Sequence, residues 1–447
     1  MAVGAIVVAL LVTAAYLTHT RGPYSEDTAQ FGRVRIYPAW LRTRGFIYLF
    51  SDARGWTASE EETARDFARD GELVVGIETP QFVNWAAGKP AADCVYMPGL
   101  LEDYSRAKQR AVNDAQYLAP ALLGHDLGGT LVYMAQLQAP PLAFRAAVAI
   151  DPQNQIALQR PFCDHPAAAA AAIGTGQKIR PERLGSNVPT RILLDGAATP
   201  AEREFVMSIP GAAPGAVGAT PHATYQAALA SIDAERSRNG VGDLPLAEVP
   251  ASDSKRDAFA IIYSGDGGWR DLDKSLAAVL ASKGMNVVGV DVLRYYWTQK
   301  TPALAAEDLA RIMRYYQQRW QQRGVVLIGF SLGANVLPFL VSRLPAELKG
   351  DVRLLSLLSP ERRTAFEVET TGWLGVHNSA GMPIAPELTK LSGIHLQCVY
   401  GRDEAADSLC TTDAAATAGA AVLVKSGGHH FDQNYDQLAD DILAAMP

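Results

Sequence analysis

One short segment of the sequence has the composition of a catalytic turn. Residues 325–334 read Val-Val-Leu-Ile-Gly-Phe-Ser-Leu-Gly-Ala, an apolar strand followed by Gly-x-Ser-x-Gly and the start of a helix. In this context the pattern predicts a nucleophile elbow, a strained turn that lifts a serine hydroxyl above the edge of a sheet. Gly329 and Gly333 are needed because the turn leaves no room for side chains there. Ser331 is therefore the predicted nucleophile, and its chemistry would be attack on a carbonyl carbon.

An acid follows Ser331 at the place that a serine triad requires, after a later strand. Residues 394–400 form this predicted strand, and the loop beyond it contains Asp403 and Glu404. Acids in such loops often lie a few residues after the glycine that ends the strand, which favours Glu404. Aspartate is the commoner residue type, so Asp403 stays the alternative, with Asp407 as the next candidate.

Two adjacent histidines lie between the last predicted strand, residues 421–424, and the last predicted helix. Their loop reads Ser-Gly-Gly-His-His-Phe from Ser426 onward. A histidine in this loop is placed to serve as the general base for the serine. His429 directly follows the glycines and is favoured, and His430 is the alternative.

The negative oxygen that forms during such a reaction needs backbone N–H donors, an oxyanion hole. One donor is predicted to be the N–H of Leu332, which follows the nucleophile. The others are expected from the Ser-Gly-Asp-Gly-Gly-Trp loop at 264–269, where Gly265, Asp266 and Gly267 are the candidates. Asp266 would be an unusual neighbour for an oxyanion. We expect its carboxylate either to face a cationic group of the substrate or to stabilise its own turn.

These motifs occupy the second of two related halves. Residues 46–79 and 259–292 share one pattern without a gap, so that Trp56 corresponds to Trp269. Apolar strands alternate with amphipathic helices in both halves, which is typical of a mostly parallel sheet with helices on both faces. The predicted fold class is therefore α/β, with two tandem domains like those of α/β-hydrolases.

The first half lacks the chemistry of the second. Asp126 stands at its elbow where Ser331 stands in the other half, and the loop at 196–200 contains no acid, although His222 stands where the histidine is expected. An aspartate can itself be a nucleophile. Without a partner acid, however, we expect this half to be a binding or scaffolding copy.

Four segments follow from this layout. We expect a signal peptide or N-terminal membrane anchor at 1–24, a degenerate hydrolase-like domain at 25–238, a linker rich in glycine, proline and charge at 239–253, and the catalytic domain at 254–447. The apolar run near the N-terminus is about 24 Å long as a helix, short for a hydrocarbon core of roughly 30 Å. Both interpretations of this run export the rest of the chain.

The composition limits which classes of partner and which cellular compartment we expect for this protein. The chain has 447 residues, 48% of them hydrophobic, and a net charge of −7 without a basic stripe, so we expect no nucleic-acid partner. An even count of four cysteines in an exported chain predicts one disulfide in each half, Cys94 with Cys163 and Cys398 with Cys410, with buried free thiols as the alternative. The cysteine spacing does not match a zinc site, so no structural metal and no cofactor is expected.

The second half resembles a known family across about residues 255–447, and the two-half layout resembles the longer members of that family. The shared motifs are Ser264-Gly-Asp-Gly-Gly-Trp269, Arg294-Tyr-Tyr-Trp297 with Thr301-Pro302, Gly329-Phe-Ser-Leu-Gly333, Tyr400-Gly401 with Cys410, and Gly428-His-His-Phe431. On these residues the chain is similar to the AcvB/VirJ bacterial virulence proteins.

The resemblance implies a periplasmic serine esterase that cleaves the lysyl or alanyl ester of aminoacyl-phosphatidylglycerol, a membrane lipid. It also implies a link to virulence and to secretion-system proteins. Asp266, Trp269, Tyr296 and Trp297 are the expected substrate-binding residues, with core packing as the alternative for the aromatic ones. A second hypothesis is a non-enzymatic periplasmic factor that binds lipid or secretion partners through a hydrolase-like surface.

Overall fold

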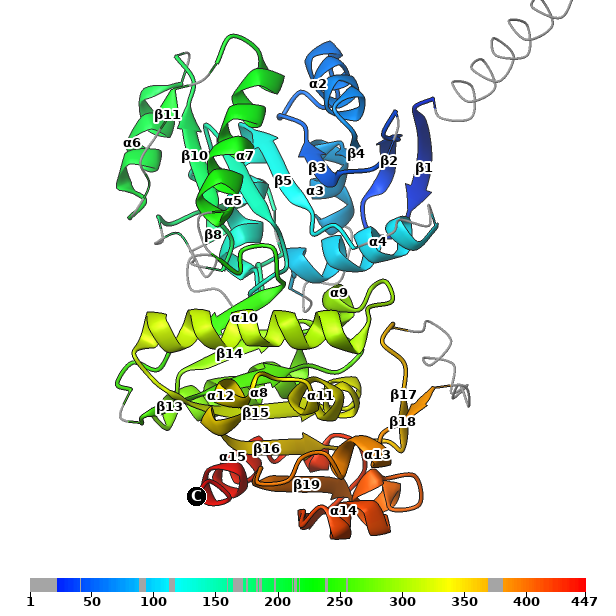
Figure 1. Cartoon of the computed structure of the whole chain (residues 1–447). Coiled ribbons are helices and arrows are strands. Elements are labelled where there is room, and N and C mark those ends of the chain that lie inside the picture. The colour runs from blue at the N-terminus through cyan, green and yellow to red at the C-terminus, as the bar shows by residue number, and fades with distance from the viewer. Residues whose placement is uncertain are drawn as a thin grey trace, which may run out of the picture. The chain divides into compact units, whose positions relative to one another are not determined.

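The computed structural model divides the chain into two compact units, Met1–Glu235 and Arg236–Pro447 (Figure 1). The predicted signal peptide or anchor falls almost wholly on residues 1–21, which lie outside the described residues. The structure describes residues 22–40, 42–87, 94–111, 117–158, 160–163, 172–173, 176–181, 184, 187–196, 198–210, 212, 215–216, 218–237, 240–254, 256–368 and 381–447.

The first unit is built on an eight-stranded sheet. In spatial order its strands are β1 (Tyr24–Thr28), β2 (Gly32–Tyr37), β4 (Glu72–Ile77), β3 (Gly45–Phe50), β5 (Ala121–His125), β6 (Ala146–Ile150), β10 (Thr190–Leu194) and β11 (Gly215–Ala216). All neighbours from β4 to β11 are parallel, whereas β1 and β2 extend the sheet in antiparallel pairs. Parallel neighbours need crossover connections, and helices supply them.

Helices cover both faces of this sheet. One face packs against α3 (Thr79–Ala87), α4 (Met97–Ala111), α5 (Leu127–Gln138) and α6 (Pro200–Ser208), and the other against α2 (Ala58–Arg69) and α7 (Pro221–Ser237). A small separate sheet contains β7 (Gln155–Ile156), β9 (Gly176–Lys178) and β8 (Ala172–Ile173). The strands at the centre of the large sheet are buried on both faces, which explains their continuous apolar runs.

The second unit repeats this plan with a seven-stranded sheet. Its spatial order is β12 (Leu246–Val249), β14 (Val287–Val290), β13 (Ala258–Tyr263), β15 (Gly324–Phe330), β16 (Val352–Leu358), β19 (Leu396–Gly401) and β20 (Ala421–Lys425). The order β14-β13-β15-β16-β19 matches β4-β3-β5-β6-β10 of the first unit. Two tandem α/β-hydrolase-like domains are therefore confirmed.

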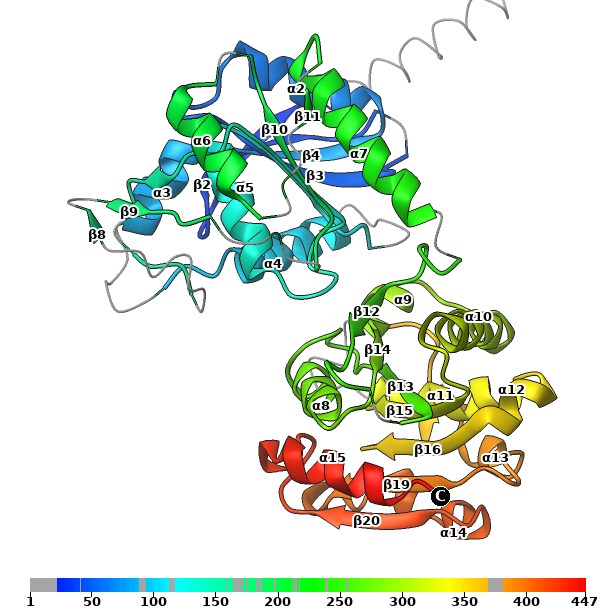
Figure 2. The ribbon, with the colours of Figure 1, turned by 90° about the vertical axis from the view of Figure 1, so that its left-hand side faces the viewer.

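The helices of the second unit also lie on two sides of the sheet (Figure 2). α8 (Asp271–Ser282) packs with α15 (Tyr435–Ala444), and α10 (Pro302–Trp320) packs with α11 (Leu332–Ser342). Shorter elements are α9 (Val292–Tyr295), α12 (Ala346–Asp351), α13 (Ala385–Leu388), α14 (Asp413–Thr417), the 3₁₀ turns η3 (Arg402–Glu404), η4 (Leu409–Thr411) and η5 (Phe431–Gln433), and the pair β17 (Arg363–Thr364) and β18 (Met382–Pro383).

Part of the segment expected to be a linker, 239–253, is a strand. β12 pairs antiparallel with β14 along Leu246–Val249, and Ala247 is 1% exposed. The glycines, prolines and charges on either side of these four residues indicated a linker. The strand lies at the edge of the sheet and pairs with only one neighbour, and such strands have weak sequence signals. The described part of the expected linker therefore contributes directly to the second sheet.

One packing contact explains the pattern that the two halves share. The ring of Trp56 lies against Gly76 on the neighbouring strand β4, and a Cβ atom at Gly76 would meet that ring at 2.2 Å. Trp269 lies against Gly289 on β14 in the same way, where a Cβ would meet the ring at 2.1 Å. Each tryptophan needs its glycine because real Cβ atoms do not approach so closely.

Both predicted disulfides are confirmed. Cys94 is bonded to Cys163, with Cα atoms 4.9 Å apart, and Cys398 is bonded to Cys410, with Cα atoms 5.5 Å apart. Disulfides fit a protein that folds outside the cytoplasm. A search of the described residues finds no helix with the length and apolar character needed to cross a membrane.

Candidate active site

Ser331 lies at a strained turn between β15 and α11. Its backbone has φ 53° and ψ −117°, and non-glycine residues with positive φ are uncommon outside functional turns. Its N–H donates to the carbonyl oxygen of Leu358 on β16 at 2.9 Å, which holds the turn against the next strand. A Cβ at Gly333 would lie 2.2 Å from the carbonyl oxygen of Tyr263. The glycine thus allows α11 to start close to the sheet and leaves the Ser331 side chain half-buried at its edge.

The predicted oxyanion loop lies beside this serine. A Cβ built on Gly265 would be 3.6 Å from Cβ of Ser331 and 3.2 Å from the Phe330 ring. The N–H of Gly268 donates to the carbonyl oxygen of Gly265 at 3.1 Å, so the loop closes as a turn with Asp266 and Gly267 at its tip. Leu332 begins α11, where the first N–H groups of a helix have no intrahelical acceptor. The start of α11 and the 264–269 loop therefore both lie beside Ser331, as the oxyanion hypothesis requires.

His429 and Glu404 form a hydrogen-bonded pair. Nδ1 of His429 lies 2.7 Å from Oε1 of Glu404, and both side chains are about one-third exposed. The His429 ring packs against Phe330, the residue before Ser331, at a centroid distance of 5.0 Å. Because an ionised carboxylate can only accept, Nδ1 carries the proton of the pair, and Nε2 is left free to accept one. Among the described residues no hydrogen bond joins this ring to the Ser331 hydroxyl.

The pair also separates the alternatives that the sequence left open. Asp403 is exposed, and its backbone N–H, not its carboxylate, meets the histidine loop by donating to the carbonyl oxygen of Gly427 at 3.2 Å. Asp407 is exposed as well. The His430 ring lies 5.5 Å from Phe330 and is exposed, whereas His429 is the histidine that contacts a carboxylate.

The environment of Glu404 keeps its carboxyl group ionised. Burial by itself would raise the pKa, but the hydrogen bond and charge of His429, together with the nearby Ser359 hydroxyl, outweigh burial and hold the pKa below its ordinary value. Ser359 follows β16 directly, is 4% exposed and has φ 49°. A carboxylate that stays ionised can stabilise the positive charge of a protonated imidazole.

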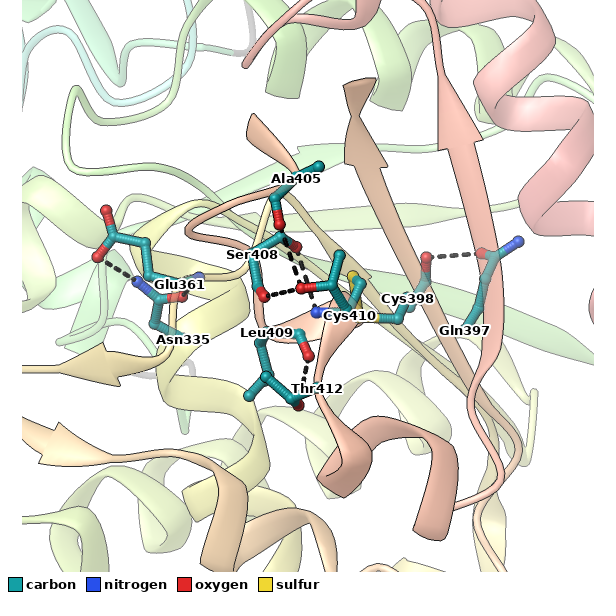
Figure 3. The surroundings of a disulfide bond; sticks show 11 residues. Asn335, Glu361, Gln397, Cys398, Ala405, Ser408, Leu409, Cys410 and Thr412 are labelled. Atoms are coloured by element: carbon teal, nitrogen blue, oxygen red, sulfur yellow. Dashed lines mark hydrogen bonds between the residues drawn. A yellow bond between two sulfur atoms is a disulfide. The ribbon is translucent and has the colours of Figure 1, made fainter. Parts of the chain in front are cut away.

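Two close contacts position the loop that carries Glu404. A Cβ at Gly401 would lie 2.2 Å from the carbonyl oxygen of Gly428, so this glycine lets the acid loop and the histidine loop touch. The Cys398–Cys410 disulfide joins the strand before the acid loop to the turn after it (Figure 3). The span between the two cysteines, which includes Glu404, is therefore held at both ends.

A chain of hydrogen bonds connects this loop to the helix after Ser331. Asn335 of α11 accepts from the N–H of Glu361 at 2.8 Å, and Figure 3 shows these two residues side by side. The N–H of Leu409 donates to the carbonyl oxygen of Pro360 at 2.9 Å. Thr411 donates its hydroxyl to the carbonyl oxygen of Ala405 at 3.1 Å. The elbow helix and the acid loop are thus braced against the same short segment.

The aromatic residues expected to bind substrate lie in the core instead. Trp269 is 5% exposed, Tyr296 is 0% exposed and Trp297 is 7% exposed. Trp269 packs on Gly289, and Tyr296 meets Phe366 edge to face at 5.6 Å. Their large apolar surfaces stabilise the fold best when they are removed from water. Of the expected substrate-binding set, only Asp266 is partly exposed beside Ser331.

The first unit keeps the elbow but not the chemistry. Asp126 accepts a short hydrogen bond from the side chain of Gln153, and Asp52, which corresponds to Gly265, forms an ion pair with Arg54. His222 is paired with an acid at α2. Its Nε2 lies 2.8 Å from Oδ2 of Asp70, at the end of α2.

Sequence reasoning missed one group of residues in this unit. His125, Asp151 and Asp195 come together at the carboxyl ends of β5, β6 and β10. Each stands at or directly after the last residue of an apolar parallel strand. Because the carboxyl ends of parallel strands meet at one edge of a sheet, that placement could have revealed the group.

The second unit is similar to a known bacterial family. Residues 257–447 match the family model described as bacterial virulence protein (VirJ). A search of curated protein sequences found no match. Among solved structures, TT1662 from Thermus thermophilus is similar with 19% identity, 46% of this chain and 93% of that chain covered, and a TM-score of 0.34. A lipase-esterase related protein from Clostridium acetobutylicum is similar with 13% identity, coverage of 45% and 99%, and a TM-score of 0.34.

Proposed function

We propose that this protein, whose second unit matches the VirJ bacterial virulence family, is a serine esterase that hydrolyses the aminoacyl ester of aminoacyl-phosphatidylglycerol. The observation that carries the proposal is the His429–Glu404 hydrogen bond beside the strained turn at Ser331. A nucleophile, a base and an orienting acid on the loops after β15, β20 and β19, at one edge of the sheet, are the parts that acyl transfer needs.

The reaction would proceed in two steps. The Ser331 hydroxyl attacks the ester carbonyl, His429 Nε2 takes the hydroxyl proton, and the N–H groups of Leu332 and the 265–267 loop stabilise the oxyanion. When the C–O bond breaks, the proton passes to the leaving hydroxyl of phosphatidylglycerol. Water then attacks the acyl-enzyme with His429 again as base, and the free amino acid leaves. Closing the distance between Ser331 and His429 would accompany substrate binding, because such bonds are often long in free enzymes.

The substrate class is supported by charge as well as by family resemblance. Lysyl and alanyl esters carry a free ammonium group a few ångströms from the scissile carbonyl. Asp266 lies in the loop beside Ser331 and is partly exposed, which supports a pairing of its carboxylate with such a group. We assign the substrate to a membrane surface and the protein to the periplasm, where an N-terminal anchor would hold it at the inner membrane.

A non-enzymatic role is the competing hypothesis. The first unit shows that this fold persists with Asp126 at its elbow and, among its described residues, without a His–Glu pair there. By the same logic the second unit would serve only to bind lipids or secretion-system proteins. The two hypotheses differ in whether Ser331 is needed. A binding surface would tolerate removal of one hydroxyl, whereas an esterase would not.

The test is a lipid assay with a matched mutant. Lipids are extracted from cells that lack the protein, express it, or express the Ser331→Ala variant at equal level. We expect aminoacyl-phosphatidylglycerol to accumulate without the protein and with the variant, and to fall when the wild type is expressed. Purified wild-type protein should release free amino acid from the lipid in vesicles. Equal lipid levels in all three strains, with no amino acid released, would favour the binding role.

A further inference from the structure

The first unit holds a second constellation of ionisable side chains at its sheet edge. The imidazole of His125 and the carboxylates of Asp151 and Asp195 each offer an atom, and the three atoms all lie within 4.8 Å of one another. His125 ends β5, and the two aspartates directly follow β6 and β10. Three neighbouring parallel strands therefore deliver one nitrogen and two oxygen ligands to one point.

Asp151 is the buried member of this group. Its side chain is 6% exposed, and its backbone has φ 46°, which is uncommon for a residue other than glycine. Oδ1 accepts the N–H of Asp195 at 2.9 Å. Within the described part of the chain, Oδ2 meets only Nε2 of His125, at 3.5 Å, which is long for a hydrogen bond. A largely buried carboxylate group with so weak a partner for one of its oxygens is costly unless a cation joins it.

The second unit shows that the fold itself does not require these residues. The N–H of Asp126 donates to the carbonyl oxygen of Ile150, the last residue of the next strand, at 2.9 Å. The N–H of Ser331 donates in the same way to the carbonyl oxygen of Leu358 at 2.9 Å. The next pair of strands corresponds in the same way. The N–H of Asp151 donates to the carbonyl oxygen of Leu193 at 3.0 Å, and the N–H of Ser359 donates to that of Val399 at 2.8 Å.

The counterparts of His125, Asp151 and Asp195 are therefore Phe330, Ser359 and Gly401. None of these three residues has an imidazole or a carboxylate. His125, Asp151 and Asp195 thus occur together in the unit that has an aspartate, not a serine, at its elbow.

We infer that the first unit binds a divalent metal cation of the zinc type through Nε2 of His125 and the carboxylates of Asp151 and Asp195. Mixed nitrogen and oxygen ligands suit borderline cations such as Zn²⁺. Bonds of about 2.1 Å in a tetrahedral site place neighbouring ligand atoms about 3.4 Å apart. His125 Nε2 and Asp151 Oδ2 are already 3.5 Å apart, and all three ligand atoms lie within 4.8 Å of one another, so side-chain rotation has to shorten the remaining separations.

The geometry also defines access and coordination. The His125 side chain is 40% exposed, so an ion can enter from solvent on that side. Asp151 would bind it on the buried side. Three protein ligands leave a fourth position for water or for an oxygen of a bound anion. This site is independent of the proposed esterase, because none of its ligands belongs to the second unit.

The experiment uses the purified full chain, freed of metal with a chelator and titrated with Zn²⁺ against a competing chromophoric chelator at neutral pH. Three variants replace each ligand by the residue found at the same place in the second unit, His125→Phe, Asp151→Ser and Asp195→Gly. Two control variants, His222→Ala and His429→Ala, remove a histidine that is paired with a carboxylate elsewhere. Thermal melting without metal establishes that each variant is folded.

We expect one zinc equivalent whose affinity falls at least 30-fold in each ligand variant and less than threefold in the controls. Zn²⁺ should raise the melting temperature of the wild type but not of His125→Phe. Titration with Co²⁺ should give the visible absorption of a four-coordinate ion, lost in the same variants. The inference would be overturned if the wild type bound no more zinc than His125→Phe. It would also be overturned if zinc affinity fell as much in His222→Ala or His429→Ala as in the ligand variants. Either result would leave a plain His–Asp ion pair.

Discussion

Asp126 and Ser331 adopt the same backbone conformation, φ 54° and ψ −118° for the first and φ 53° and ψ −117° for the second. Holding a non-glycine residue there costs on the order of 1–3 kcal/mol, so both units carry the strain of an elbow. Only the second unit places a hydroxyl on it. The strained turn is thus a property of the fold, and the residue on it decides what chemistry is available.

Ser331→Ala should abolish ester hydrolysis without unfolding the protein. Removing a triad nucleophile lowers turnover by at least about a thousandfold, because the other members cannot act alone. The matched control is Asp126→Ala, which changes the same turn of the first unit and should leave turnover within twofold. Steady-state kinetics on a short-chain ester and circular dichroism provide the measurements. Undiminished turnover by Ser331→Ala would refute the mechanism.

Glu404→Gln should be far more harmful than Asp403→Asn. The glutamine keeps the shape but loses the charge that orients and stabilises the imidazole, so we expect a loss of roughly two to four orders of magnitude in kcat. Asp403 has an exposed side chain, and its contact with Gly427 is made by its backbone, so its variant should lose less than threefold. If both variants stay active, Asp407 becomes the acid to test.

Glu404 should also stabilise the fold in a pH-dependent way. Its pKa lies below the ordinary value of 4.5, so the native state binds fewer protons here than the unfolded state. The stabilisation is therefore complete above about pH 4.5 and is lost as pH falls through the lowered pKa. Urea unfolding between pH 3 and 6 should show a smaller decline in Glu404→Gln than in the wild type. The difference should be modest because the group is partly exposed. Parallel curves would mean that the pair does not stabilise the fold.

Asp266→Asn should discriminate between substrates. If its carboxylate pairs with the amine, the variant should lose about tenfold or more in kcat/KM on lysyl- or alanyl-phosphatidylglycerol and less than threefold on a neutral ester of similar size. The amide keeps the size of the side chain and its capacity to close the turn. Equal losses on both substrates would indicate that Asp266 only shapes the oxyanion loop.

Breaking the Cys398–Cys410 disulfide should affect both stability and catalysis. Replacing both cysteines with serine removes a cross-link over a sequence separation of 12, which stabilises by about 3 kcal/mol in the chain-entropy account. Because the bridged segment carries Glu404, kcat should fall as well. The control is the Cys94–Cys163 pair, whose loss should destabilise the first unit but leave kcat unchanged. Unfolding by urea and steady-state kinetics on both double mutants would show whether the bridge positions the acid.

Those parts of the protein whose signals lie in neighbouring residues could be predicted from the sequence. The Gly-x-Ser-x-Gly turn, the alternation of strands and helices and the internal repeat all depend on neighbouring residues, so the tandem fold and the elbow at Ser331 were predictable. The disulfide pairs were predictable as well, because the four cysteines divide two and two between the halves.

Contacts between side chains of different loops became clear only from the folded chain. Whether Glu404 or Asp403 reaches His429 depends on how two loops pack through Gly401 and Gly428, which is a contact between distant segments. The burial of Tyr296 and Trp297 was equally hidden, since an aromatic residue suits a core and a binding site alike.

The group at His125, Asp151 and Asp195 also depends on contacts between distant segments of the chain. Its members are far apart in the sequence, and each would be an ordinary polar residue at a strand end. Parallel strands bring them to one edge, and that edge exists only in the folded sheet.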